Sequence, residues 1–168
     1  MPVRPLLLYP DRRLRLKAQP VTEWNDSVPA LAADVIDTMR AVGAVGLTAS
    51  HIGDLRRLVV IRLEPADLPR TFVNLKVVWA SPEQAVHTEG SVSMPGVTEE
   101  IERPAVLRVR YQDLSGAICE EEAEGFRAAC LQHEIDQLDG VFWTDRLSRL
   151  KRDRLVKRFE KLRRANAT

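Results

Sequence analysis

The chain has 168 residues, of which 45% are hydrophobic and 29% are charged, and its formal net charge is +1. This balance is typical of a folded soluble domain and excludes a disordered or fibrous protein. Two cysteines are too few for a disulfide framework, and no apolar run approaches the roughly 18 residues that span a membrane. We therefore expect a cytoplasmic protein with a single domain over residues 1–168.

The first helix is expected to begin near Ser27, a favoured N-cap residue that places Pro29 in the first turn. Apolar residues recur at helical spacing from Leu31 to Met39, which gives the helix one buried face. The glycines of residues 43–46 should end it.

The middle of the chain changes to the period of β-strands. β-branched runs lie at residues 57–63 and 75–79, and residues 105–111 alternate between two faces. A turn at residues 113–116 leads into a further strand around Ile118.

Helical character returns at Phe126 and is expected to end near Gly140. A second helix is expected over residues 148–164. The order of one helix, several short strands and two helices predicts an α+β fold, with helices packed against mainly antiparallel strands.

The C-terminal helix is strongly basic. Residues 144–168 hold ten Lys/Arg against three Asp/Glu, whereas the rest of the chain holds 15 basic and 21 acidic residues. This asymmetry is compatible with contact to RNA, the ribosome or another anionic surface, and equally with a solvated helix face.

The most informative segment for chemistry is QHEIDQ at residues 132–137. In an H-E-x-x-H helix, the two His share one face and hold a metal together, while the Glu takes a proton from metal-bound water. Here position i+4 is Gln137, so the motif lacks one ligand. By spacing alone, a structural His133 beside a surface Glu134 is the alternative interpretation.

Three segments in chain order resemble motifs of the peptide deformylases. AVGLTASH at residues 44–51 is similar to G-x-G-L-A-A-x-Q, EGSVSMPG at residues 89–96 to E-G-C-L-S-x-P-G, and HEIDQLDG at residues 133–140 to H-E-x-D-H-L-x-G. The resemblance covers nearly the whole chain. It implies the deformylase-like α+β fold, in which antiparallel strands surround a central motif-bearing helix and a C-terminal helix follows.

The resemblance implies an enzyme in which a Cys thiolate and two His hold iron or zinc, and a Glu acts as general acid and base. The reaction removes the N-terminal formyl group from nascent peptides. By position, Ser91 stands at the Cys, His133 and Gln137 stand at the two His, and Glu134 is retained as the catalytic carboxylate. A hydroxyl and an amide are poor ligands for zinc or iron, so we expect an altered or absent metal site.

His51 stands where the family has a Gln whose amide stabilises the oxygen of the tetrahedral intermediate. A neutral His51 can replace that amide by hydrogen bonding, or it can join residues 133–134 in a relocated metal site. By resemblance, the backbone at Gly46, Leu47 and Val92 lines an extended peptide.

Other polar residues are expected outside the reaction. Thr98 stands where many deformylases have a substrate-binding Arg, and His87 is assigned a surface or packing role. Cys130 is expected in the core, since free Cys usually behaves as a small buried hydrophobe. Asp136 and Asp139 are expected to cap or to hydrogen-bond locally.

Two functions of different classes remain open. The first is an amide hydrolase of the deformylase type, which the retained Glu134 favours. The second is a non-catalytic peptide-binding or ribosome-associated module, which Ser91 and Gln137 favour. Direct nucleophilic attack by Ser91, with His133 or His51 as its base, is a further possibility.

Overall fold

The computed structural model describes residues 3–167 of the chain. In chain order its elements are α1 (Ser27–Val42), β1 (Gly46–Thr48), β2 (Leu58–Ile61), β3 (Arg70–Ala80), β4 (Gln84–Ser91), β5 (Met94–Pro104), β6 (Val106–Gln112), β7 (Ile118–Glu124), α2 (Gly125–Leu138) and α3 (Arg149–Asn166). Short 3-10 turns lie at Arg12–Arg15, Ala49–Ile52 and Trp143–Arg146.

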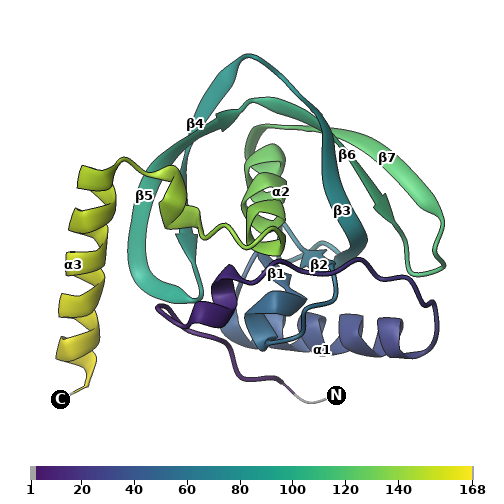
Figure 1. Ribbon diagram of the computed structural model, residues 1–168, viewed down its shortest axis with the longest axis horizontal. Helices are drawn as coiled ribbons and strands as arrows, with labels where there is room; N and C mark the ends of the chain where they lie inside the picture. Colours follow the sequence, from purple (N-terminus) through teal and green to yellow (C-terminus); the bar gives the residue numbers. More distant parts are fainter. Residues whose placement is uncertain (1–2, 168) are drawn as a thin grey trace.

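The strands of residues 3–167 form a five-stranded sheet in the order β1-β2-β3-β6-β7 and a separate β4-β5 hairpin. All pairings within these sheets are antiparallel. Figure 1 shows α2 between the hairpin and the larger sheet, with α1 beneath the sheet and α3 on the outer side of β5. The predicted α+β fold, with antiparallel strands around the motif-bearing helix, is confirmed.

Helix α1 ends as predicted, because Gly43 adopts φ 68°, a left-handed conformation that glycine tolerates best. Its start differs by one residue from the prediction. Asp26 is the N-cap and Ser27 is the first helical residue. The Ser27 hydroxyl donates to Asn25 Oδ1 instead of capping the helix.

Helix α2 is buried on most of its surface, which is unusual for a helix of mixed polarity. Ala128, Leu131 and Leu138 pack into the core, yet the polar side chains of Gln132, Glu134, Asp136 and Gln137 are buried as well. Buried polar groups cost free energy unless they are hydrogen-bonded. Because α2 is buried, the surrounding strands and turns must supply hydrogen-bond partners for its polar side chains.

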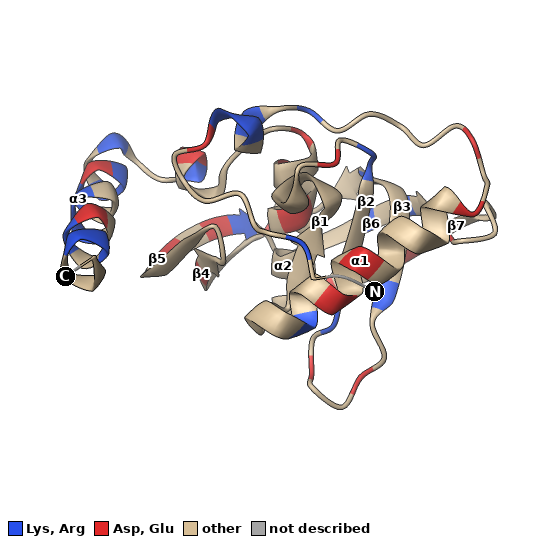
Figure 2. Cartoon of the chain, turned by 90° about the horizontal axis from the view of Figure 1, so that it is seen from below, with Lys and Arg blue, Asp and Glu red and all other residues tan. Residues whose placement is uncertain are grey.

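Helix α3 begins after Ser148, whose hydroxyl accepts a hydrogen bond from the Lys151 amide as an N-cap. Leu155 and Phe159 are buried in the core cluster that also contains residues of β5. Lys and Arg residues recur along the rest of the helix (Figure 2). Within residues 3–167, no helix is both long and apolar enough to span a bilayer.

Candidate functional site

A cleft of about 620 Å³ opens between α2, the β4-β5 hairpin and the segment that leads into β1. Six of the side chains or backbone positions singled out from the sequence line it: Gly46, His51, Ser91, Val92, His133 and Glu134. The fold thus brings the three sequence motifs together. Two predicted site residues lie elsewhere, since Leu47 is fully buried in the core around α1 and Gln137 is not part of the cleft wall.

His133 is oriented by a carboxylate from the hairpin. Its Nδ1 lies 2.8 Å from Glu89 Oε1, and Arg103 donates to both oxygens of Glu89 at 2.6 and 2.9 Å. Burial opposes protonation of His133, but the Glu89 hydrogen bond and the charge of Glu134 raise the imidazole pKa above its usual value. With Nδ1 bonded to Glu89, Nε2 is the nitrogen available to a ligand in the cleft.

The Glu89–Arg103 pair belongs to a buried network that the sequence did not reveal. Arg103 also donates to Asp136 at 2.8 Å, and Arg146 donates to the same carboxylate at 2.6 and 2.9 Å. Although burial alone would raise the pKa of Glu89, the bonds from Arg103 and His133 hold that pKa below its usual value. Asp136 is therefore an ion-pair partner of arginines outside its helix, and Asp139 pairs with Arg57, which corrects the expectation that both cap or hydrogen-bond locally.

Glu134 presents a carboxyl group with one unpartnered oxygen. The residue is only 5% exposed, and Oε2 has no hydrogen-bond partner among residues 3–167. Burial, opposed by His133 and reinforced by Glu89, raises the pKa of Glu134 above its usual value. A buried carboxyl with a raised pKa and an unpartnered oxygen is the kind of group that serves as a general acid or base.

Gly46 makes room for this carboxyl. A Cβ at position 46 would lie 2.9 Å from Glu134 Oε1, closer than a Cβ approaches other heavy atoms in proteins. Glycine at position 46 therefore leaves the space that the Glu134 carboxyl occupies, and a larger residue would displace that carboxyl.

His51 is buried and tied to the turn that follows β1. Its Nδ1 accepts the Thr48 backbone N–H at 3.0 Å and lies 2.8 Å from the Thr48 hydroxyl. Burial, with a contribution from the charge of His133, lowers the pKa of His51 to about 3. The ring is therefore neutral at physiological pH and carries its proton on Nε2, so it acts as a hydrogen-bond donor.

Of the three positions that the resemblance assigns to metal ligands, the two that carry a replaced residue have hydrogen-bond partners within the protein. Ser91 Oγ accepts the Ser93 backbone N–H at 3.1 Å. The Gln137 amide donates to the Leu14 backbone carbonyl at 2.6 Å, and the residue is only 3% exposed. No group of three or more His, Cys, Asp or Glu within residues 3–167 is arranged to hold a metal ion.

Several residues assigned to other places lie on the cleft wall. Cys130 lines the cleft instead of the core, and burial, together with Glu134 and Glu89, raises its thiol pKa to about 12. His87, expected at the surface or in packing, also lines the cleft, as does Thr98, which stands where many deformylases have a substrate-binding Arg. Phe126 adds an aromatic ring to the cleft wall, and the residue is 51% exposed. The sequence did not indicate this role, because Phe126 stands alone at the start of a helix and belongs to none of the three motifs.

Comparison with known proteins agrees with this arrangement. The family model described as "Polypeptide deformylase" matches residues 3–153. The chain belongs to the polypeptide deformylase family. Its motif-bearing helix, hairpin and C-terminal helix are therefore those of a deformylase fold.

Relatives within the deformylase family fall under two names. A protein named "Peptide deformylase-like" from Bradyrhizobium diazoefficiens is 57% identical, and the alignment covers 98% of this chain and 96% of that one. A "Peptide deformylase" from the same organism is 43% identical over 96% of this chain and 97% of its own length. The crystal structure of a peptide deformylase from Legionella pneumophila superimposes with a TM-score of 0.91 at 35% identity, covering 99% and 98% of the two chains.

Proposed function

We propose that this chain binds the N-terminal part of a peptide in the deformylase cleft but does not hydrolyse it through a metal site of the family type. The observation that carries the proposal is the hydrogen bond from Gln137 to the Leu14 carbonyl. That bond holds the amide nitrogen of the side chain that stands at the position of the second His against the N-terminal segment, and Gln137 is not part of the cleft wall.

The donor chemistry argues against iron or zinc at these positions. A hydroxyl lacks the charge and softness of a thiolate, and an amide oxygen suits hard cations and binds them weakly without carboxylates. Losing one residue that orients a ligand already costs roughly 10–100-fold in metal affinity, and here two ligands themselves are replaced. His133 is the single family donor that remains, so we derive no reaction step through a metal.

The cleft retains what peptide binding requires. Its volume of about 620 Å³ is that of a small-ligand site, and Phe126 and Val92 supply apolar wall. The neutral His51 ring offers an N–H donor, the type of group that binds a peptide or formyl carbonyl oxygen. A peptide ligand is also the expectation for a chain whose relatives are named peptide deformylases.

A second candidate function, amide hydrolysis without a family-type metal, rests on Glu134. Its unpartnered Oε2 and raised pKa are properties of a general acid or base. In that mechanism Glu134 would take a proton from water and deliver it to the leaving amine, while His51 would bind the carbonyl oxygen. This function retains the catalytic roles that the resemblance assigned to Glu134 and His51.

The basic C-terminal helix supports a third element of the proposal, contact with the ribosome or another RNA surface. Figure 2 shows several Lys and Arg positions along α3. Among residues 3–167, the cations of that helix that contact a carboxylate or a backbone carbonyl are Arg149, Lys151, Arg158 and Arg164. The other cations of α3 are available to an anionic partner.

The proposal is tested with a formyl-methionyl peptide in two parallel assays. Calorimetry should detect saturable binding, and a formate assay should detect no release with or without added iron, zinc or cobalt. Formate release that depends on Glu134 would instead establish the second candidate. If the peptide is neither bound nor hydrolysed, both functions are rejected.

A further inference from the structure

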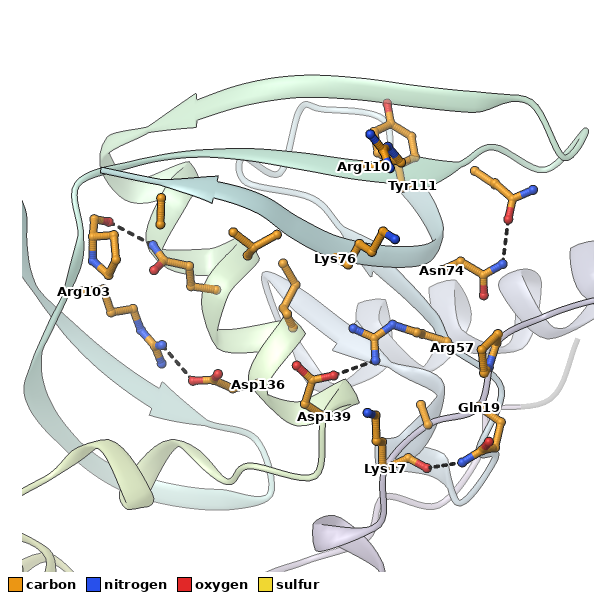
Figure 3. A pocket seen from close by; sticks show the side chains of 18 of the residues that line it. Lys17, Gln19, Arg57, Asn74, Lys76, Arg103, Arg110, Tyr111, Asp136 and Asp139 are labelled. Carbon is orange, nitrogen blue, oxygen red and sulfur yellow. Dashed lines mark hydrogen bonds and ion pairs between the residues drawn. The ribbon is translucent and has the colours of Figure 1, made fainter. Parts of the chain in front are cut away.

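A second and larger cavity, of about 1080 Å³, lies on a different face of α2 from the cleft. It is bounded by α2, by strands β3 and β6 and by the segment that precedes α1. Figure 3 shows Lys17, Arg57, Lys76 and Arg110 around this cavity, with Asp139 joined to Arg57. The deformylase-type cleft does not use any of these four residues.

The charged lining of this cavity is predominantly cationic. Six Lys or Arg side chains line it against three acidic ones, Glu102, Asp136 and Asp139. Asp136 is shared by two arginines, and Asp139 pairs with Arg57 at 2.7 Å. Lys17 and Lys76 form no ion pair within residues 3–167, so the cavity carries positive charge that the described chain does not neutralise.

Arg57 supplies a buried, partly unused donor group. The residue is 8% exposed, and its guanidinium donates from Nε to the Leu75 carbonyl at 2.9 Å and from Nη1 to Asp139. Its Nη2 has no hydrogen-bond partner among the described residues. A buried guanidinium with free donors on a cavity wall is suited to an oxyanion, because its N–H groups match carboxylate and phosphate geometry.

The strand register places two of these cations side by side. Lys76 of β3 is the cross-strand partner of Arg110 of β6. Like charges directly opposite one another in a sheet destabilise the pairing. Glu120 lies 3.2 Å from Arg110 and its side chain is 42% exposed. No carboxylate of residues 3–167 pairs with Lys76. An anion between Lys76 and Arg110 would remove this repulsion.

We propose that this cavity binds a small anionic molecule with phosphate or carboxylate groups, held by Lys17, Arg57 and Lys76. A concave site of this volume suits a small molecule, whereas a nucleic-acid backbone requires an open basic surface. Val77 and Ile118 add apolar wall for the uncharged part of the ligand. The site is separate from the peptide cleft and does not depend on the function proposed for that cleft.

The test is calorimetric titration of the full chain with pyrophosphate and, separately, with citrate. The double variant Lys17→Gln/Lys76→Gln should weaken binding at least about tenfold, since a hydrogen bond to a charged group is worth roughly that factor. The matched control is Arg12→Gln/Arg40→Gln, which removes the same charge from exposed positions that do not line the cavity. The control should bind within about twofold of the native chain.

The two probes distinguish a phosphate ligand from a carboxylate ligand. Binding of pyrophosphate alone supports a phosphate ligand, binding of citrate alone supports a carboxylate, and binding of both supports selection by charge. Absence of saturable binding by either probe, or equal weakening in both double variants, overturns the proposal. On the native chain, amide NMR shifts caused by the bound probe should cluster at Lys17, Asn74 and Tyr111, and shifts confined to α3 would also overturn it.

Discussion

The side-chain amide of Gln137 donates a 2.6 Å hydrogen bond to the backbone carbonyl of Leu14, a residue 123 positions earlier in the chain. The bond ties the motif-bearing helix α2 to the N-terminal segment. Gln137 thus has a structural partner at a position where the resemblance implies a metal ligand.

Gln137→Ala should destabilise the fold by about 1–3 kcal/mol, because it leaves a buried carbonyl acceptor without its donor. Urea unfolding followed by circular dichroism measures the change. Gln84→Ala is the matched control, since its exposed amide makes only a 3.4 Å bond to Pro82, and it should stay within about 0.5 kcal/mol. A loss no larger than that of the control would show that the Leu14 bond contributes nothing to stability.

Restoring the family ligands should restore a metal site. Ser91→Cys with Gln137→His supplies a thiolate and a second imidazole beside His133, and residues 133 and 137 share a helix face. Titration with cobalt should then give a thiolate charge-transfer band that the single Ser91→Cys variant does not give at the same affinity. A double variant that folds but shows no band would mean that these positions do not correspond to the family ligands.

Arg103 should be among the most sensitive positions for stability. Its side chain is 5% exposed and balances two buried carboxylates, Glu89 and Asp136. Arg103→Met removes the guanidinium that both carboxylates share and should lower the free energy of unfolding by about 3–5 kcal/mol. Arg108→Met, which removes an exposed Arg 3.8 Å from Glu122, should cost less than about 1 kcal/mol. Similar losses in the two variants would contradict the role of the buried network.

His51 should remain neutral in the folded protein well below pH 6.5. Its pKa is lowered to about 3 from 6.5, so between these values the unfolded chain binds a proton that the folded chain does not. Stability from this residue is therefore present above pH 6.5 and is lost as the pH falls toward 3. The free energy of unfolding should fall more between pH 7 and pH 4.5 for the native chain than for the His51→Gln variant. An NMR titration of the His51 ring that showed protonation near pH 6 would refute the lowered pKa.

The fold was largely predictable because its periodic signals are local. Gly43 ended α1, the alternation of residues 105–111 predicted β6, and Ser148 capped α3 as its residue type suggests. The 11-residue strand β5 was not foreseen, because its stretch from Met94 carries two prolines and several glutamates. This segment forms a strand because it pairs with β4, and the local sequence does not indicate that pairing.

The site was predictable in its motif residues but not in their partners. His133 and Glu134 stand in one recognisable segment, whereas Glu89 and Arg103 approach them only through tertiary structure. No spacing rule joins Gln137 to Leu14 or Arg57 to Asp139, which are 123 and 82 residues apart. Hydrogen-bond partners at such separations follow from how the elements pack, and that information is not contained in local patterns.

The most direct test of the absent family-type metal site is elemental analysis of the native protein, purified without added metal and dialysed against a mild chelator. The matched positive control is Ser91→Cys/Gln137→His, loaded with zinc and dialysed in the same way. We predict well under one equivalent of zinc, iron or nickel in the native chain, because one remaining family donor, His133, cannot hold such an ion tightly. A full equivalent retained by the native chain would contradict the account.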